Sequence, residues 1–170
     1  HKLGNPLDPD ITLGPMASAS LAKLVRKQIS TAIEKGAKPH IERFAKDDGK
    51  AYLSPQILTN VNHEMDIMRE ENFGPVVGVM PVNDDIEAIR MMNDSHYGLT
   101  ASLWTCNLKR AEQIGKRVET GTIFMNRADY LDPALCWTGC KDTGRSGALS
   151  TIGYQNLTRP KSFHLKKLML

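Results

Sequence analysis

The sequence has few cysteines and no long apolar run. It contains three cysteines in 170 residues, Cys106, Cys136 and Cys140. An odd and small number of cysteines does not indicate a disulfide framework, so we expect a reducing compartment, which we take to be the cytoplasm. No apolar stretch approaches the roughly 20 residues that a membrane span needs, and no charged-then-apolar leader opens the chain. We therefore expect no membrane partner.

The sequence also lacks the common signatures of metal and dinucleotide sites. Its five histidines form no close pair, and Cys136 and Cys140 have no second pair to complete four ligands. We therefore predict no metal site. No Gly-x-Gly-x-x-Gly follows a predicted strand, which argues against a self-contained dinucleotide-binding fold. The net charge of +3 comes from 22 basic and 19 acidic residues, a balance that does not indicate a nucleic-acid partner.

What the sequence does contain is an alternation of strand and helix patterns. The 41% apolar and 24% charged residues are typical of a globular protein. The first predicted elements are a helix that is capped by Ser18 or Ser20 and closed by Gly36, and a hairpin of residues 40–45 and 51–58 that turns at Asp48-Gly49, with Pro55 on an edge strand. A short helix after Asn62, a strand buried on both faces at 76–82 and a helix capped by Asn83 follow. The last predicted elements are strands at 100–105 and 121–126 around a helix that starts at Asn107 and turns Leu108 inward, a loop at 135–153 and a half-exposed strand at 161–170. This order predicts an α/β fold with βαβ crossovers and a parallel sheet.

The stretch MREENFGPVVGV combines an acid pair, an aromatic residue, a glycine and a proline ahead of an apolar run. The carboxylate of Glu71 suits the two hydroxyl donors of a ribose, and the ring of Phe73 can pack against a planar ring. Gly74 permits close backbone approach and Pro75 stiffens the entry to the strand. The same residues also fit a solvated helix-end charge and a core aromatic, and the stretch by itself leaves both interpretations open.

Two further stretches invite a functional interpretation. Residues 139–146, GCKDTGRS, have the spacing of a phosphate loop with Arg145 in place of lysine, but the flanking residues favour a glycine-rich surface loop. Cys106 lies at a strand-to-helix junction, where a helix N-terminus can lower the pKa of a thiol. No histidine is nearby in sequence, so a small residue beside the helix cap is the favoured interpretation.

Five stretches in order resemble the NAD(P)-dependent aldehyde dehydrogenase superfamily, over its C-terminal third. GNPLDPDITLGPM is similar to the Gly-Asp-Pro-Leu-Asp-Pro…Gly-Pro segment of that family, and REENFGPVVGVMPV to its Glu-x-Phe-Gly-Pro-Val motif. AIRMMNDSHYGLTASLWT resembles the Asn…Tyr-Gly-Leu-x-Ala stretch, and TGTIFMN the Gly-x-Ile-x-x-Asn strand. GCKDTGRSG…GYQNLTRPK resembles the Gly-x-Lys-x-Ser-Gly…Gly…Thr-x-x-Lys ending.

The resemblance implies roles for four residues. Glu71 would hold the nicotinamide ribose of NAD or NADP, and Phe73 would contact the nicotinamide. Leu131 and Trp137 would line the tunnel of a small-molecule aldehyde substrate. The resemblance further implies a three-layer, parallel-sheet catalytic domain over residues 1–158. The strand or tail at 159–170 would join a homo-oligomer, a dimer or tetramer, by pairing with another subunit.

The resemblance also implies what this chain does not supply. The family's cysteine nucleophile, glutamate base, oxyanion-hole asparagine and dinucleotide fold precede the matching region, so we expect a domain truncated at its N-terminal side and inactive alone. No catalytic residue is therefore assigned. CWTGCK stands where the family usually has Pro-Phe-Gly-Gly before lysine, and Thr143 stands where serine is usual. An acylating or semialdehyde dehydrogenase, an acyl-phosphate reductase and a strand-pairing interaction module remain alternatives.

Overall fold

The computed structural model describes residues 1–41, 50–128 and 130–167. The chain divides into two compact units, His1–Asn83 and Asp84–Leu170. Within the described part, no helix is both long enough and apolar enough to cross a bilayer. The predicted division into residues 1–158 and a tail at 159–170 stays a prediction.

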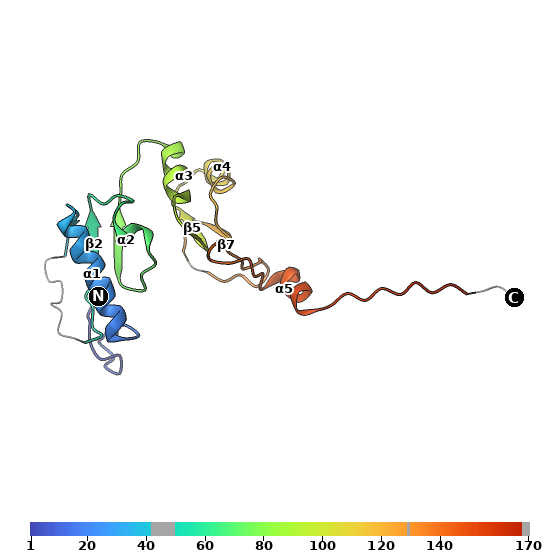
Figure 1. The fold of residues 1–170 in the computed structure, drawn as a ribbon, viewed down its shortest axis with the longest axis horizontal. Helices are drawn as coiled ribbons and strands as arrows, with labels where there is room; N and C mark the ends of the chain where they lie inside the picture. Colours follow the sequence, from blue (N-terminus) through green and yellow to red (C-terminus); the bar gives the residue numbers. More distant parts are fainter. Residues whose placement is uncertain (42–49, 129, 168–170) are drawn as a thin grey trace. The chain divides into compact units, whose positions relative to one another are not determined.

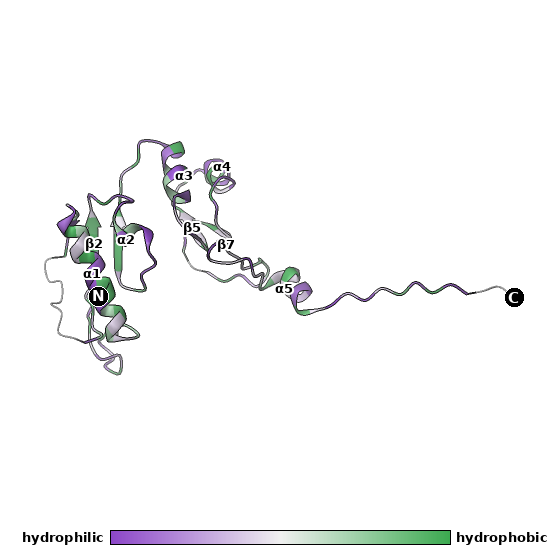
Figure 2. Cartoon of the chain, viewed as in Figure 1, coloured by the Kyte–Doolittle hydropathy of each residue, from purple (hydrophilic) through white to green (hydrophobic). Residues whose placement is uncertain are grey.

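The first unit is organised around helix α1, Ala19–Glu34 (Figure 1). The Ser18 side chain accepts a hydrogen bond from the Leu21 amide and so caps the helix. At the other end Gly36 has a φ of +102°, a left-handed conformation that glycine adopts without steric cost. Both predicted helix ends are therefore confirmed. Figure 2 shows the alternation of hydrophobic and hydrophilic residues along the helix, as expected when only one face is buried.

A three-stranded sheet in the order β1-β2-β3 lies beside α1. The elements are β1 at Lys38–Pro39, β2 at Gln56–Thr59, α2 at Asp66–Arg69 and β3 at Val76–Val79. β1 pairs antiparallel with β2, whereas β2 pairs parallel with β3 after the crossover through α2. The short helix was predicted. An antiparallel pair was also predicted, but between residues 40–45 and 51–58, whereas β1 lies at Lys38–Pro39 and pairs with Leu58 and Thr59; residues 42–49, with the turn at Asp48-Gly49, lie outside the described residues. The prediction that Pro55 restricts its strand to an edge is wrong, because the proline precedes β2 and its missing N–H is not part of the ladder.

One face of the sheet packs against the helices and the other is open. On the covered face, Gly78 lies so close to Met68 that a Cβ at this position would be 2.3 Å from the Met68 sulfur. On the opposite face, Val77 and Val79 are 53% and 49% exposed. The prediction that both faces of this strand are covered is therefore wrong for this unit, because its helices cover only one face.

The apolar core of the first unit is formed by one cluster. Its members come from α1, from the sheet and from the segments around α2. They are Val25, Ile29, Ala32, Ala37, Leu53, Leu58, Val61, Met65 and Ile67. Leu58 is fully buried, so this cluster is a dry hydrophobic core of the kind that stabilises a small domain.

The second unit contains a clear βαβ crossover. Its elements are α3 at Asp85–Asn93, β4 at Tyr97–Gly98, β5 at Thr100–Leu103, α4 at Leu108–Gly115, β6 at Thr122–Met125, β7 at Cys140–Lys141 and α5 at Ser150–Leu157. β5 and β6 pair parallel around α4, and β4 pairs antiparallel with β7. The predicted parallel pairing is thus confirmed, although the described strands of the chain form three separate sheets.

Several details of the second unit differ from the prediction. Asp84, not Asn83, caps α3 by accepting from the Glu87 amide. Asn107 caps α4 as predicted, but Leu108 is 71% exposed rather than inward-facing. The predicted loop at 135–153 contains β7 and the start of α5. α5 carries no apolar stripe, since Gly153 is its one buried residue among those described, and so helical periodicity did not reveal it.

The segment after α5 runs out as an extended chain (Figure 1). Residues 158–167 pair with no strand of the described chain and are exposed throughout. Phe163 and Leu165 are 71% and 85% exposed. The predicted half-exposed strand is therefore wrong for this chain by itself, because an extended segment becomes a strand only when another strand satisfies its backbone groups.

Candidate cofactor and substrate sites

Glu71 and Phe73 lie on the loop between α2 and β3, in the first unit. Gly74 brings this loop against α1, since a Cβ there would be 2.8 Å from Cγ1 of Val25. The Pro75 carbonyl accepts a hydrogen bond of 2.8 Å from the Gln56 amide, which begins the parallel pairing of β2 and β3. The glycine and the proline thus hold the loop in place, while Phe73 is 76% exposed. The ring is therefore no core residue of this unit and is free to pack against a ligand.

Glu71 borders a small pocket of about 220 Å³. The lining comes from one face of α1 and from both ends of α2, and consists of Leu24, Lys27, Gln28, Thr31, Asp66, Glu70 and Glu71. Gln28 is 7% exposed, and its Oε1 atom has no hydrogen-bond partner. The lining therefore includes the carboxylates of Asp66, Glu70 and Glu71, whose oxygens can accept hydrogen bonds from the hydroxyl groups of a ribose.

Leu131 and Trp137 border one apolar pocket in the second unit, of about 520 Å³. Leu99, Ala148 and Leu149 complete its described lining. Leu99 follows β4 in the Tyr-Gly-Leu stretch, Leu131 lies beyond β6, and Leu149 immediately precedes α5. The two residues that the sequence assigned to a tunnel are thus brought together, and sequence reasoning missed the other three.

Backbone pairing holds Trp137 in this pocket. The Trp137 amide donates to the Ala148 carbonyl at 2.8 Å, and the Ala148 amide donates back to the Trp137 carbonyl at 2.9 Å. This isolated antiparallel bridge places Leu149 directly beside the pocket. The backbone of Leu149 has a φ of +61° and a ψ of 175°, a conformation that residues other than glycine rarely adopt.

The amide of Asn126 ties the end of β6 to the segment after β5. Its Oδ1 accepts from the Thr105 amide at 2.9 Å, and its Nδ2 donates to the Thr105 carbonyl at 2.8 Å. Asn126 has a φ of +55°, which asparagine tolerates better than most residues. The asparagine of the Gly-x-Ile-x-x-Asn stretch therefore adds two side-chain hydrogen bonds at the end of the β5–β6 pairing.

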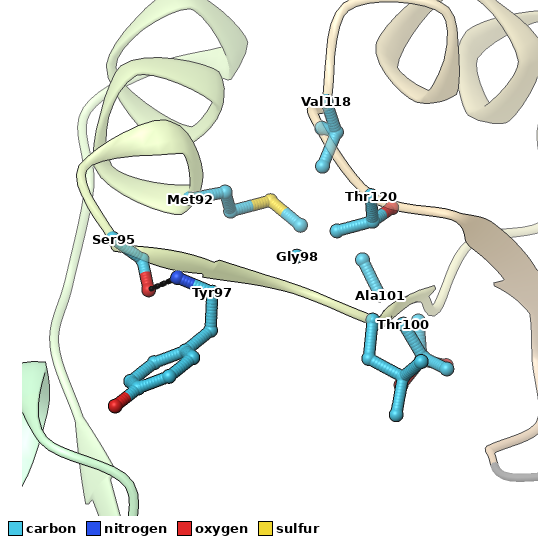
Figure 3. A pocket seen from close by; sticks show the side chains of 10 residues that line it. Met92, Ser95, Tyr97, Gly98, Thr100, Ala101, Val118 and Thr120 are labelled. Atoms are coloured by element: carbon cyan, nitrogen blue, oxygen red, sulfur yellow. Dashed lines mark hydrogen bonds between the residues drawn. The ribbon is translucent and has the colours of Figure 1, made fainter. Parts of the chain in front are cut away.

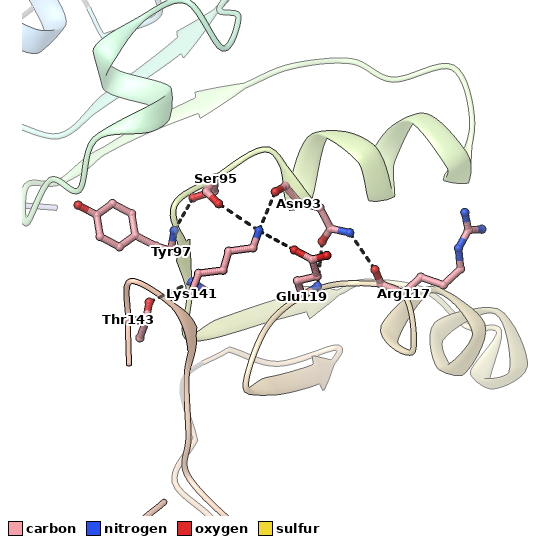
Figure 4. A network of polar contacts seen from close by, with 8 residues as sticks. Asn93, Ser95, Tyr97, Arg117, Glu119, Lys141 and Thr143 are labelled. Carbon is pink, nitrogen blue, oxygen red and sulfur yellow. Dashed lines mark hydrogen bonds and ion pairs between the residues drawn. The ribbon is translucent and has the colours of Figure 1, made fainter. Parts of the chain in front are cut away.

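Lys141 is the centre of a polar network in the second unit (Figure 4). Its Nζ donates to the carbonyls of Asn93 and Ser95 at 2.7 and 3.0 Å and lies 3.0 Å from a Glu119 carboxylate oxygen. The hydroxyl of Thr143 accepts from the Gly98 amide at 2.9 Å. Serine would offer the same hydroxyl, so the change to threonine retains the contact.

This network gives residues 139–146 a structural role. Lys141 is committed to two carbonyls and one carboxylate, and β7 at its position pairs with β4. Helix α5 begins only at Ser150, four residues beyond the stretch. A phosphate loop needs a buried strand directly before it and a helix directly after it, and neither is found in this part of the chain.

Two glycines permit close approaches between backbone segments around β4 and the start of β6. A Cβ on Gly121 would be 1.7 Å from the Thr138 carbonyl oxygen, and one on Gly98 would be 2.4 Å from the Glu119 carbonyl oxygen. Real Cβ atoms do not approach backbone so closely, so both positions require glycine.

Another hollow of the unit, about 430 Å³, also has Leu99 in its lining. Figure 3 shows Met92, Val118 and Thr120 directed toward one another over the strand, with the Tyr97 ring on its opposite side. None of the residues assigned to cofactor or substrate lines this hollow.

The cysteines and histidines do not form a reactive or metal-binding cluster. Cys106 is exposed just before the α4 cap, and the described lining of the apolar pocket includes none of the three cysteines. Across residues 1–41, 50–128 and 130–167, no three histidine, cysteine, aspartate or glutamate side chains are grouped as metal ligands. The linings of the two candidate sites consist chiefly of carboxylate groups in the first unit and of aromatic and aliphatic groups in the second.

Comparison with known proteins places the chain in a family. A family model described as the aldehyde dehydrogenase family matches residues 1–163. A probable betaine aldehyde dehydrogenase of Schizosaccharomyces pombe is 34% identical over 160 residues, which are 94% of this chain and 32% of that protein.

Comparison with solved structures finds aldehyde dehydrogenases as well. The chain superposes on a succinic semialdehyde dehydrogenase from Streptococcus pyogenes in complex with NADP+ with a TM-score of 0.83 and 33% identity, over 90% of this chain and 34% of that one. For a Mycobacterium tuberculosis aldehyde dehydrogenase complexed with NAD+ the TM-score is 0.84 and the identity 29%, over 96% of this chain and 35% of that one. The chain thus spans about one third of the length of these relatives.

Proposed function

The chain belongs to the aldehyde dehydrogenase family, and on this premise we propose that it is the C-terminal third of an enzyme that oxidises an aldehyde to a carboxylic acid with NAD or NADP. One observation of the structure supports this most directly. Leu131 and Trp137, six residues apart on an irregular segment, border the same apolar pocket. A pocket with aliphatic and aromatic walls is suited to the organic part of an aldehyde.

The cofactor would accept a hydride from the substrate carbon, and this chain would position its nicotinamide end. Glu71 would accept hydrogen bonds from the ribose hydroxyls through its carboxylate, since such charge-assisted bonds are stronger than neutral ones. Phe73 would pack its exposed ring against the nicotinamide. The support is the loop geometry, in which Gly74 and Pro75 anchor the backbone and leave both side chains outside the core.

The reacting groups would come from the remainder of the enzyme. A thiolate there would add to the aldehyde carbonyl, and a carboxylate base there would activate the water that releases the acid. The balance is one aldehyde, one water and one oxidised cofactor to one acid, one reduced cofactor and one proton. Cys106, Cys136 and Cys140 take no part, and we propose that the 170-residue chain is inactive alone.

We further propose that residues 1–158 form part of a three-layer, parallel-sheet catalytic domain. The exposed faces of Val77 and Val79 would then be covered by the other layers of that domain. The exposed tail at 159–170 would pair with a strand of another subunit, which would satisfy its backbone groups and bury Phe163 and Leu165. Gel filtration with and without the tail tests the pairing: an unchanged oligomer after deletion of the tail would refute it.

The enzymatic proposal is tested with the full-length protein and the 170-residue chain in parallel. We expect aldehyde-dependent formation of reduced cofactor from the full-length protein and none from the chain. Turnover by the chain itself would show that the reacting groups lie within it.

Glu71→Gln tests the cofactor role. We expect cofactor binding to weaken by about 1.5–3 kcal/mol, the range for a hydrogen bond to a charged group. Glu64→Gln is the matched control, because Glu64 is exposed in the same unit and does not border the pocket. Equal cofactor affinity of Glu71→Gln and the unmodified enzyme, measured by titration calorimetry, would remove Glu71 from the site.

A further inference from the structure

Three segments of the second unit meet at the ammonium group of Lys141 (Figure 4). Its Nζ donates to the carbonyls of Asn93 and Ser95, at the end of α3 and in the turn that follows, and its ion pair with Glu119 reaches the turn after α4. The Asn93 side chain donates to the Arg117 carbonyl at 2.9 Å and accepts from the Glu119 amide at 2.8 Å. Two side chains therefore join the end of α3 and the turn after α4 to β7.

Backbone contacts at the same place bring the loop that carries Trp137 against β4. β7 pairs antiparallel with β4, and the Gly98 amide donates to the Thr143 hydroxyl at 2.9 Å. At the other end of the loop, the Thr138 carbonyl oxygen lies where a Cβ on Gly121 would be only 1.7 Å away. The loop is therefore anchored on both sides of Lys141.

Two walls of the apolar pocket are the direct neighbours of these anchors. Leu99 follows Gly98, and Trp137 precedes Thr138. Both side chains border the pocket of about 520 Å³. The separation of these two walls therefore depends on how firmly the loop is held against β4, to which the contacts of Lys141 contribute.

The backbone of Lys141 has an uncommon conformation that fits such a role. Its φ of +55° lies in the left-handed region, which residues other than glycine seldom adopt. Such conformations persist where surrounding contacts hold them, and they occur preferentially at functional sites. The Lys141 side chain is 22% exposed, so its ammonium group is partly withdrawn from water and directed at its three partners.

From these observations we infer that Lys141 is a positioning residue, which sets the place of Trp137 relative to Leu99 and thereby the fit of a bound aldehyde between the two walls. This inference rests on the proposed function, in which the pocket holds the substrate. Lys141 would act through the loop, since it is not among the described residues that line the pocket. Loss of its contacts should weaken substrate binding and leave the chemical step unchanged.

The test is a double-mutant cycle in the full-length protein, because such a cycle separates an effect exerted through Trp137 from a general loss of stability. The substrate is whichever of hexanal, phenylacetaldehyde, succinic semialdehyde and betaine aldehyde has the highest kcat/KM. We expect Lys141→Met to raise KM about tenfold with kcat changed by less than about twofold. In a Trp137→Ala background the same substitution should raise KM by less than about twofold. Lys141→Arg, which retains a cationic donor, should restore most of the loss.

The thermal midpoint supplies the second readout. Lys141→Met should lower it equally in both backgrounds, because the hydrogen bonds to the Asn93 and Ser95 carbonyls do not involve the Trp137 side chain. Lys116→Met is the matched control, since Lys116 is an exposed lysine of the same unit that pairs with Glu112 and does not border the pocket. Its KM should equal that of the unmodified enzyme.

An unchanged KM for Lys141→Met, equal increases of KM in the two backgrounds, or a loss confined to kcat would overturn the inference and leave the proposed function intact. Absence of turnover by the unmodified protein with all four aldehydes would remove the proposed function and the inference with it. If Lys141→Met does not fold, Thr143→Val takes its place in the cycle, because it removes the acceptor of the Gly98 amide from the same anchor. The same coupling to Trp137 is then expected, and additive effects on KM would again overturn the inference.

Discussion

The two units of the chain are stabilised by different means. The first contains all nine members of the apolar cluster around α1, with Leu58 fully buried. The second has four buried apolar residues among those described, Ile89, Ala111, Val118 and Phe124, and its long loop is held by side-chain hydrogen bonds to the backbone. The comparison shows that, where the apolar core is small, a loop that borders a pocket can be held in place by side-chain hydrogen bonds to backbone carbonyls and by close backbone contacts at glycines.

This difference predicts that truncation of a buried aliphatic side chain lowers the free energy of unfolding most in the first unit. Leu58→Ala should lower the free energy of unfolding of this unit by about 2–5 kcal/mol, because it leaves a cavity in a packed core. Ile57→Ala is the matched control, since Ile57 is the adjacent residue of β2 and is 41% exposed. Denaturant titration followed by hydrogen exchange of residues 1–83 measures both. Equal losses for the two variants would contradict the packing described here.

In the second unit the largest effect should come from Lys141. Lys141→Met removes the donor to the Asn93 and Ser95 carbonyls and should cost about 1.5–3 kcal/mol, the range for hydrogen bonds that involve a charged group. Glu119→Gln leaves both carbonyl contacts, and Glu119 is 60% exposed, so its effect should be about 0–1 kcal/mol. Hydrogen exchange at residues 84–167 distinguishes them. A greater loss for Glu119→Gln would show that the ion pair, and not the carbonyl contacts, holds the loop.

A smaller loss of stability is expected when the hydrogen bonds between the Asn126 side chain and Thr105 are removed. Asn126→Asp retains the acceptor for the Thr105 amide but loses the donor to its carbonyl, which should cost about 0.5–1.5 kcal/mol. Asn126→Gly loses both bonds while tolerating the positive φ, so it should cost about twice as much. Thermal denaturation of the two variants orders them. The reverse order would mean that strain at this position outweighs the amide bonds.

The smallest effect concerns the pH dependence of the second unit. Asp85 receives two hydrogen bonds from Arg110, at 2.8 and 2.5 Å, and these bonds lower the pKa of its carboxyl. Because the pKa is lower in the folded state, the stabilisation is present above the ordinary aspartate pKa and is lost as the pH falls through the folded value. Asp85→Asn should therefore be slightly less stable than the unmodified chain at neutral pH.

The difference between Asp85→Asn and the unmodified chain should shrink below roughly pH 4, where an unperturbed aspartate becomes protonated. Glu112→Gln should show the same sign, since Lys116 lowers the pKa of Glu112 chiefly through a hydrogen bond. Stability measured against pH tests both. A difference that grows toward acid pH would contradict the ion pairs.

Elements with a strong local signal were predictable. α1 has a continuous apolar face and a serine cap, and the β5–α4–β6 crossover is marked by strand patterns around the Asn107 cap. α5 was not predictable, because its residues are mostly exposed and no stripe distinguishes them from a loop. The burial of β3 was overestimated for a related reason: an apolar strand does not reveal whether a second layer covers it.

Residues of the candidate site could be predicted only where the family resemblance assigns them a role. Leu131 and Trp137 followed from the family resemblance, and the pocket contains both. Leu99 is part of a quoted stretch but was assigned no role, and Leu149 lies in the predicted loop at 135–153 without one. A leucine with positive φ leaves no local trace in a sequence, so its position could be found only in the structure.

By itself the sequence determined the boundaries of α1, the Asn107 cap of α4, the β5–α4–β6 crossover and the family of this protein. Periodicity and capping act over a few residues, and motif order survives without coordinates, so these features are readable along the chain. The tertiary structure alone decided that segments near residues 99, 131–137 and 148–149 share a pocket, and that Lys141 is committed to the backbone. Those features depend on distances between remote segments, which are set by backbone pairing and close glycine contacts and not by spacing in the sequence.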